Sequence, residues 1–293
     1  MHVLVYGSSG FLGSRICELL EQKEHKVTRG IARIDNPRQL KSELVDVNPT
    51  HVFSATGRTH MDGFNTIDGL EGDRSKLTIN IQDNLTGPLV LASLCVELRV
   101  HLTILSTGCI YHSQYKGEKA LDSFTELDHP NFFGSSYSIV KGSLNSVLAQ
   151  DVFASKVLTL RIRLPIFTHP HARNSLTKIL TYPKICSLDN SITDWDLFER
   201  YLQTLMMCKI TGLLNFVNRG AVSHRFIIDK YRLMVDPNHK CKFVSPSELA
   251  ATLKAERSNC VLDTSRLENI FDGVPTATDA IVNTLQSYGL NLH

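Results

Sequence analysis

Short apolar runs alternate with amphipathic stretches along the first half of the chain. Apolar runs typical of buried strands lie at 3–6, 51–55, 101–107 and 157–163, with a shorter one near 26–29. Stretches with helical spacing follow Gly10 and lie near 37–46, near 76–99 and at 136–150. The second of these begins with Asn36-Pro37, a capping residue and a first-turn proline. The alternation predicts right-handed βαβ units and a doubly wound parallel α/β sheet.

The pattern becomes less regular after about residue 164, before a strand at 213–217 and a helix from Ser223. We therefore expect a first domain over 1–163 that is completed by about 211–236. A smaller C-terminal lobe is expected from 164–210 and 237–293. Because ligands of open α/β sheets bind at the carboxyl ends of the strands, we expect the lobe to cover that edge and to hold a substrate there.

Composition limits the class of protein. Of the 293 residues, 42% are hydrophobic and 20% charged, which is ordinary for a folded chain with a sizeable core. The net charge of +2 and the lack of a basic block argue against nucleic-acid binding. Seven scattered cysteines without a CxxC pair argue against disulfides and a zinc site, and no apolar run approaches a membrane span. We expect a cytoplasmic protein without a metal.

A glycine pattern follows the first apolar run. Gly7-Ser8-Ser9-Gly10-Phe11-Leu12-Gly13 has the spacing GxxGxxG between a strand and a helix. Such glycines let the backbone approach a pyrophosphate at a helix N-terminus, whose dipole favours the anion. The pattern predicts a Rossmann-type dinucleotide site; the alternative is a glycine turn that binds nothing. The expected cofactor contacts here are Gly7, Ser9, Gly10, Phe11, Leu12 and Gly13.

The end of the second strand bears on the choice of cofactor. An NAD site places an acidic residue there, but this chain has Thr28-Arg29-Gly30, with Arg33 close by. Arginines at this place favour the 2′-phosphate of NADPH. The alternative is a solvated arginine, which leaves NADH open.

A tyrosine and a lysine share one face of the helix at 136–150. Tyr137 and Lys141 are four positions apart, and a cation beside a phenol lowers its pKa from about 10 toward neutrality. Such a tyrosine can protonate a carbonyl oxygen as hydride arrives. Thr107, after Ser106 at the end of a strand, is expected to donate a second hydrogen bond to that oxygen. YxxxK also occurs on surface helices, but with the glycine pattern it indicates a carbonyl reductase.

These residues together resemble the extended short-chain dehydrogenase/reductases, in particular the group of dTDP-4-dehydrorhamnose reductase and GDP-fucose synthase. Longer segments resemble the plant-type UDP-4-keto-6-deoxyglucose 3,5-epimerase/4-reductases, which some giant viruses carry as stand-alone proteins. The segments lie between the first strand and about residue 267: Thr50–Phe53, Ala55–Gly57, Ser106–Ile110, Arg161–Ile166, Asn215–Phe216, Val222–His224, Arg257–Asn259 and Leu262–Asp263.

Two regions depart from the family pattern. Residues 58–75 match poorly, and 80–87 is longer than the family helix. Asn84 and Gly87 match the family's Asn-x-x-Gly better than Asn80 does.

The resemblance implies further site residues. At the cofactor it implies Tyr137, Lys141, Ala55, Thr56, Gly57, Asn84 and Pro165. At the substrate it implies Thr107, Cys109, Asn174, Lys178, Asn215, Arg257 and Asn259. Arg163 is a further candidate for diphosphate or pyrimidine, because a guanidinium fork suits phosphate oxygens.

Cys109 and Lys178 point to proton transfer as well as reduction. In a 4-keto sugar, C3 and C5 flank the carbonyl, so loss of either proton gives an enolate with its charge on the C4 oxygen. Cys109 lies two residues after Thr107, which places both side chains on one side of a continuing strand. The resemblance implies Cys109 and Lys178 as base and acid, whereas GDP-fucose synthase pairs Cys with His. The alternatives are a small buried cysteine and a solvated lysine.

The sequence is thus identified as a member of the bifunctional 3,5-epimerase/4-reductase family. The resemblance implies conversion of UDP-4-keto-6-deoxy-D-glucose to UDP-L-rhamnose with NADPH, after an upstream UDP-glucose 4,6-dehydratase. It also implies a cytoplasmic location, in the host if the source is viral, and relatives are often homodimers. Two alternatives stay open: a monofunctional dTDP/UDP-4-dehydrorhamnose reductase, and a non-catalytic NADP-binding regulatory subunit.

Overall fold

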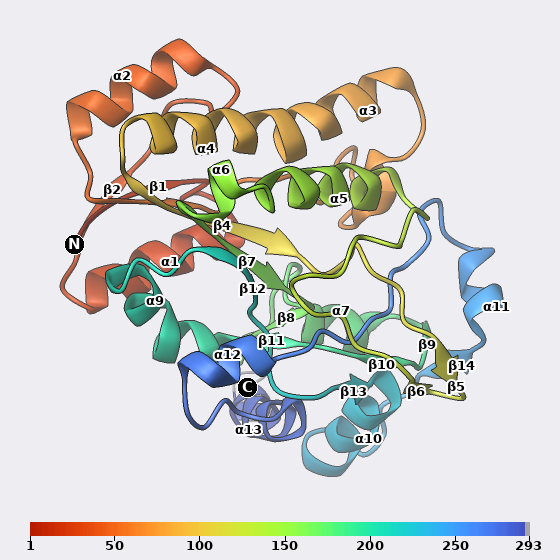
Figure 1. Cartoon of the computed structure of the whole chain (residues 1–293). Coiled ribbons are helices and arrows are strands. Elements are labelled where there is room, and N and C mark those ends of the chain that lie inside the picture. Colours follow the sequence, from red (N-terminus) through yellow and green to blue (C-terminus); the bar gives the residue numbers. More distant parts are fainter. Residues whose placement is uncertain (291–293) are drawn as a thin grey trace. The chain divides into compact units, whose positions relative to one another are not determined.

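The computed structural model describes residues 1–290 (Figure 1). The chain divides into two compact units. The first comprises Met1–Thr107, Ser135–Leu160 and Tyr201–Leu214, and the second comprises the segments between and after these. The segments 108–134, 161–163 and 215–236 thus fall in the second unit, whereas the sequence pattern assigned 1–163 and about 211–236 to the first domain. Thr107 and Cys109, two residues apart in sequence, belong to different units.

A six-stranded sheet runs through the first unit in the order β12-β7-β4-β3-β1-β2. Its strands are β1 (His2–Tyr6), β2 (Lys26–Arg29), β3 (His51–Ser54), β4 (His101–Thr107), β7 (Val157–Ile162) and β12 (Gly212–Asn215). β1 pairs in parallel with β2 and β3, and β3 pairs in parallel with β4. The predicted doubly wound parallel α/β fold is therefore confirmed.

Helices cover both faces of this sheet (Figure 1). They are α1 (Phe11–Gln22), α2 (Pro37–Val47), α3 (Arg74–Ile81), α4 (Gly87–Glu97), α5 (Ser136–Leu148), α6 (Asp151–Ala154) and α9 (Gln203–Met207). The chain passes from β1 to β2 and then back across β1 to β3, so right-handed crossovers place α1 on one face and α2 and α4 on the other. The apolar sides of α2, α4 and α5 pack on the strands around Leu4, Val52 and Leu102.

A π-helical turn, Gln82–Thr86, joins α3 to α4. It lies in the segment that is expected from the sequence to be longer than the family helix, and it forms a widened turn within a continuous helix. The next residue, Gly87, packs against Ile34 in the loop after β2. The contact is close, since a Cβ on the glycine would lie 2.8 Å from Ile34 Cγ1.

The second unit is built from short elements. Its strands form two-stranded sheets: β5 (Tyr115–Lys116) with β6 (Lys119–Ala120), β8 (Pro165–Ile166) with β11 (Thr193–Asp194), β9 (Lys184–Cys186) with β14 (Lys242–Val244), and β10 (Asp189–Asn190) with β13 (Val222–Ser223). Its helices are α7 (Ser175–Thr181), α8 (Trp195–Leu197), α10 (His224–Met234), α11 (Pro246–Ala250), α12 (Ser265–Ile270) and α13 (Ala277–Leu290).

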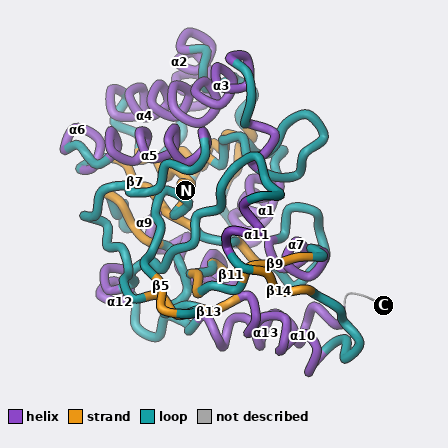
Figure 2. The backbone as a smooth tube through the Cα atoms, turned by 90° about the vertical axis from the view of Figure 1, so that its right-hand side faces the viewer, coloured by secondary structure: helices purple, strands orange, loops and turns teal. Residues whose placement is uncertain are grey.

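The core of the second unit lies between α10 and α13, which run side by side (Figure 2). Ile227, Ile281 and Leu285 are fully buried in it. The predicted helix from Ser223 is α10, and Ser223 Oγ caps it by accepting a hydrogen bond from the Phe226 amide at 3.2 Å. Within residues 1–290, no helix is both long and apolar enough to cross a bilayer.

Candidate functional site

The glycine turn after β1 is shaped by close backbone packing. Gly7 has a φ of +75°, and a Cβ there would lie 2.9 Å from the Ala55 carbonyl carbon. A Cβ on Gly13 would lie 2.0 Å from the Gly7 carbonyl oxygen. Because neither position has room for a side chain, the turn presents bare backbone, and α1 starts close against β1.

This turn sits where dinucleotides bind in α/β sheets. β1 is the strand at which the strand order reverses, and the turns after β1 and β3 follow the carboxyl ends of these two strands. Gly10, the residue before α1, has no side chain to cap the first amides of the helix. The first turn reads Phe11-Leu12-Gly13-Ser14, without an acidic residue, and Ser9 is exposed beside it. Uncapped backbone amides and the absence of a negative side chain in the first turn suit the binding of a pyrophosphate at this helix N-terminus.

The two arginines predicted to favour NADPH are paired with carboxylates. Arg29 Nη1 lies 2.7 Å from Glu21 Oε1. Arg33 Nε lies 2.9 Å from Asp35 Oδ1, and Arg33 Nη2 lies 3.2 Å from Asp83 Oδ1. The hydrogen bond from Arg33 is the main reason why the pKa of Asp35 is lowered. Arg33 remains mostly exposed, with 66% of its side chain accessible, so a phosphate can reach it in competition with these carboxylates.

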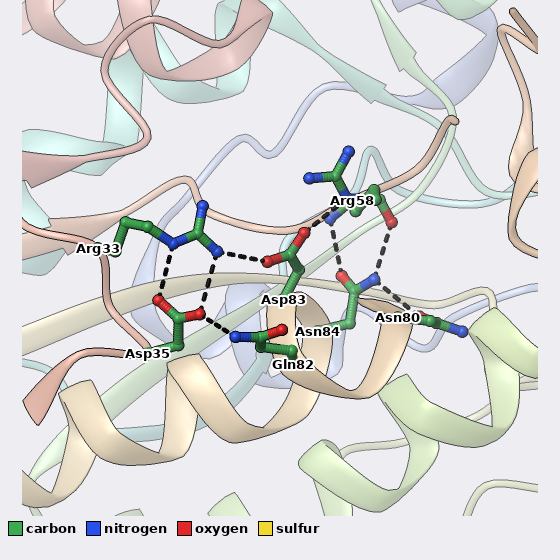
Figure 3. A network of polar contacts seen from close by, with 7 residues as sticks. All are labelled: Arg33, Asp35, Arg58, Asn80, Gln82, Asp83 and Asn84. Carbon is green, nitrogen blue, oxygen red and sulfur yellow. Dashed lines mark hydrogen bonds and ion pairs between the residues drawn. The ribbon is translucent and has the colours of Figure 1, made fainter. Parts of the chain in front are cut away.

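A polar network extends from Arg33 to the loop after β3 (Figure 3). Asp83, in the π-helical turn, also accepts a hydrogen bond from Arg58 Nε at 2.6 Å. Its neighbour Asn84 holds the Arg58 backbone, accepting from the amide at 3.0 Å and donating to the carbonyl at 2.9 Å. Asn80 Oδ1 accepts a further bond from Asn84 at 2.9 Å. The family-implied Asn84 thus fixes the loop that begins with Ala55, Thr56 and Gly57.

Tyr137 and Lys141 lie on the buried face of α5. They are 6% and 3% exposed, and Ser135 Oγ caps the helix through the Ser138 amide at 3.1 Å. A Cβ on Gly57 would lie 3.9 Å from Lys141 Nζ, so the lysine reaches the loop that Asn84 fixes. Burial lowers the pKa of Lys141 to about 8.

Two hydroxyls lie at the end of β4 in the same unit. Thr107 is 7% exposed and Ser106 is 5% exposed. Ser106 Oγ is buried and has no hydrogen-bond partner among the described residues. The first unit therefore contains the glycine turn, Asn84, the buried tyrosine and lysine, and these two hydroxyls.

Cys109 in the second unit has a partner that the sequence did not indicate. Arg163 Nη1 donates to Cys109 Sγ at 2.7 Å. Arg163 is 3% exposed, and its Nη2 donates to Asn190 Oδ1 and to the Ser258 carbonyl, each at 2.5 Å. The guanidinium expected to hold phosphate is thus engaged with protein groups, one of which is the proposed catalytic sulfur.

Lys178 is half-buried in α7. Its pKa is lowered to about 8, first by burial and then by the positive charges of Arg173 and Arg257. An ammonium that titrates close to neutral pH suits an acid or base. Arg173, in the turn just before α7, was not singled out by the sequence patterns.

Asn174 and Asn215 are fully buried and hold the protein's own backbone. Asn174 Oδ1 accepts from the amides of Phe167 and Leu176, and its Nδ2 donates to the carbonyls of Phe167 and His169. These four bonds use the whole hydrogen-bonding capacity of the amide, leaving none for a substrate. Asn174 therefore serves as the cap that starts α7 and so places Lys178.

The other residues that the resemblance implies at the substrate or the cofactor differ in their burial and hydrogen bonds. Asn215 Nδ2 donates to the carbonyls of Phe124 and Asp263, each at 2.9 Å. Asn259 Oδ1 accepts from Asn190 Nδ2 at 3.0 Å, while Arg257 and Asn259 stay partly exposed. Pro165 is also partly exposed, at the start of β8.

Comparison with known proteins assigns this arrangement a family. The chain matches the NAD dependent epimerase/dehydratase family over residues 3–150. It is similar to L780 of Acanthamoeba polyphaga mimivirus, with 41% identity over 275 residues that cover 94% of each chain. The crystal structure of L780, a UDP-rhamnose synthase, matches with a TM-score of 0.93 and 39% identity, over 98% of this chain and 99% of that one.

Plant enzymes are also similar. A bifunctional dTDP-4-dehydrorhamnose 3,5-epimerase/dTDP-4-dehydrorhamnose reductase of Arabidopsis thaliana is 34% identical over 95% of this chain and 90% of its own length. The trifunctional RHM2 of Arabidopsis thaliana, a UDP-glucose 4,6-dehydratase, UDP-4-keto-6-deoxy-D-glucose 3,5-epimerase and UDP-4-keto-L-rhamnose-reductase, is 34% identical over 92% of this chain but only 39% of its own length.

Proposed function

Because the chain belongs to the NAD dependent epimerase/dehydratase family, we propose that it converts UDP-4-keto-6-deoxy-D-glucose to UDP-L-rhamnose with NADPH. The reaction consists of epimerisation at C3 and C5 and reduction at C4. The observation that carries the proposal is the 39% identity, over 98% of the chain, with a UDP-rhamnose synthase of the same fold. The plant relatives, which combine epimerase and reductase activities, support the same pair of reactions.

The first unit is proposed to hold the dinucleotide. The glycine turn and the N-terminus of α1 suit its pyrophosphate, and the loop at Ala55–Gly57 lies against Gly7. Arg29 and Arg33 are proposed to bind the 2′-phosphate by exchanging their carboxylate partners for phosphate oxygens. NADPH supplies the hydride that reaches C4.

Three residues of the first unit are proposed to act at the C4 oxygen. Tyr137 gives its phenolic proton to this oxygen, and Thr107 donates a hydrogen bond to it. Lys141 lies one helical turn from Tyr137 on the same buried face, so its ammonium favours the phenolate that remains. With a pKa of about 8, Lys141 exchanges protons near neutral pH.

Two residues of the second unit are proposed to move protons at C3 and C5. Cys109 takes the proton from carbon, and the electron pair of the C–H bond passes to the C4 oxygen as the enolate forms. Lys178 gives a proton to the opposite face of the same carbon, which inverts it. Exchange with solvent then returns both side chains to their starting states, since the Cys109 thiol loses a proton and the Lys178 amine gains one.

The substrate's chemistry indicates the reaction that precedes this one. A 4-keto-6-deoxy sugar nucleotide arises when a 4,6-dehydratase oxidises C4 and removes the oxygen from C6. RHM2 carries such a dehydratase activity in one chain with the two activities proposed here. We therefore place a UDP-glucose 4,6-dehydratase upstream of this protein.

The test follows deuterium into the product. The enzyme, NADPH and UDP-4-keto-6-deoxy-D-glucose are incubated in D₂O, and the product is analysed by proton NMR. Deuterium at both C3 and C5 of an L-rhamnose product is expected. A reduced 6-deoxy sugar without deuterium contradicts epimerisation and supports a plain reductase, while cofactor binding without turnover supports a regulatory subunit.

Variants then test the roles of the side chains. Cys109→Ala or Lys178→Ala is expected to lower deuterium exchange about 100-fold or more, the range of general acid–base catalysis. The loss of reduction of UDP-4-keto-L-rhamnose should be far smaller. Cys208→Ala, which removes an exposed thiol, is the matched control for loss of a cysteine. Full exchange in both Ala variants would show that other groups move the protons.

A further inference from the structure

Arg163 is almost fully buried, and its side chain has no carboxylate partner among its hydrogen bonds to residues 1–290. Its donors reach a sulfur, a side-chain amide oxygen and a backbone carbonyl, on Cys109, Asn190 and Ser258. Its Nε has no hydrogen-bond partner within residues 1–290. Burying a cation with only neutral acceptors is costly, so a group that becomes negative beside it would offset much of that cost.

Of the three groups that accept hydrogen bonds from Arg163, Cys109 is the one that can become negative. Its sulfur lies 2.7 Å from Arg163 Nη1, within reach of a charge-assisted hydrogen bond. Burial opposes the charge of Arg163, but nearby ionisable groups, with Cys109 first among them, raise the pKa of the guanidinium on balance.

We propose that Arg163 is the positioning residue of Cys109, holding the sulfur in place and offsetting the negative charge that the sulfur carries when it acts as a base. The proposal rests on the proposed role of Cys109 in epimerisation. In the proton step, the thiolate of Cys109 takes a proton from C3 or C5 and becomes a neutral thiol, while the charge moves to the C4 oxygen. The Nη1 hydrogen bond fixes the direction from which the sulfur approaches the carbon.

The same guanidinium is tied to the segment that carries Arg257 and Asn259. Its Nη2 binds the Ser258 carbonyl directly, and Asn190, its other acceptor, donates to Asn259 Oδ1 at 3.0 Å. Asn190 is itself held by its bond to the Leu188 carbonyl at 3.1 Å. A continuous set of hydrogen bonds therefore joins the proposed substrate-binding segment to the sulfur, so the position of one constrains the position of the other.

The test compares two half-reactions in Arg163→Met. Deuterium exchange into UDP-4-keto-6-deoxy-D-glucose is measured without NADPH, and reduction of UDP-4-keto-L-rhamnose is measured with it. The expected result is a fall of about tenfold or more in the ratio of exchange to reduction, since a misplaced base loses rate steeply. Arg163→Lys should recover part of the ratio, because it returns a cation without the fork.

Arg161→Met is the matched control. Arg161 is a buried arginine two residues earlier, and it stacks on Tyr111 and donates to the carbonyls of Thr125 and Glu126. Its loss should disturb the unit as much as the loss of Arg163, but it should lower the two half-reactions in similar proportion. An equal ratio in the two Met variants would overturn the proposal, because Arg163 would then act only in folding.

Two further variants keep the result decisive. If Arg163→Met does not fold, Asn190→Ala removes one acceptor of the guanidinium, and a several-fold fall in the same ratio is expected; an unchanged ratio opposes the proposal. Cys109→Ala separates this proposal from the proposed function. Full exchange in Cys109→Ala refutes the role of the cysteine itself, whereas lost exchange there with a normal ratio in Arg163→Met refutes only the role of the arginine.

Discussion

The buried ammonium of Lys141 allows a quantitative test of the reasoning about the first unit. Lys141 is 3% exposed, and burial is the cause that lowers its pKa from 10.5 to about 8. Each pH unit between these values corresponds to about 1.36 kcal/mol, so the charged lysine costs roughly 3 kcal/mol of folding free energy at pH 7. Lys141→Met removes the charge and keeps an unbranched side chain, and it should stabilise the protein by up to that amount.

The pH dependence of this difference has a definite sign. The folded pKa lies below the unfolded one, so between pH 8 and 10.5 the unfolded chain holds a proton that the folded chain has lost. The wild-type protein therefore gains stability relative to Lys141→Met as the pH rises through this window. The advantage of the variant should fall from roughly 3 kcal/mol at pH 7 to about 1.5 kcal/mol at pH 9.5, and nearly vanish at pH 10.5.

Urea unfolding followed by far-UV circular dichroism measures both quantities in the absence of cofactor. Lys156→Met, at an exposed lysine, is the control for the change of side chain and should show neither effect. A Lys141→Met protein that is equally or less stable at pH 7, or whose advantage is the same at pH 9.5, refutes the argument. The variant should also lose most of its reductase activity, so the lysine would be kept for catalysis at the expense of stability.

Two other expectations concern His51 and Arg33. Burial, followed by the charge of His101, lowers the pKa of His51 to about 4, so its contribution to stability is present above pH 6.5 and is lost as the pH falls toward 4. The urea concentration at the midpoint of unfolding should therefore decrease less between pH 7 and pH 5 in His51→Gln than in the wild type. An equal decrease in the two proteins would contradict this. Arg33→Ser should raise the KM for NADPH about tenfold while changing the KM for NADH little; an equal rise for both cofactors in initial-rate kinetics would show that Arg33 does not bind the 2′-phosphate.

Local patterns account for most of the first unit. Asn36 and Pro37 were predicted as cap and first-turn residue, and Asn36 Oδ1 does accept from the Gln39 amide ahead of α2. The strands at the sheet's centre are buried on both sides, so they form apolar runs that are visible in the sequence. Such features depend on neighbouring residues, and the sequence therefore predicts them well.

Other features depend on residues far apart in the chain. Arg163 and Cys109 are separated by 54 positions, and no spacing rule links an arginine after one strand to a cysteine after another. The sequence showed that the segment 80–87 is too long, but its form as a π-helical turn depends on its packing against neighbouring elements. Asn174 was within reach of prediction, since an asparagine before a helical stretch is a capping signal, but the family resemblance pointed to the substrate instead.

The π-helical turn has a consequence for how this protein can change in evolution. Its wide winding lets the consecutive residues Asp83 and Asn84 both reach Arg58, although successive residues of an α-helix point about 100° apart. Deleting one residue from Gln82–Thr86 would rewind the helix and turn Asp83 away from its arginines. Insertion or deletion of a single residue, rather than a substitution, is therefore the simplest genetic change that would alter the contacts of this turn with its arginines.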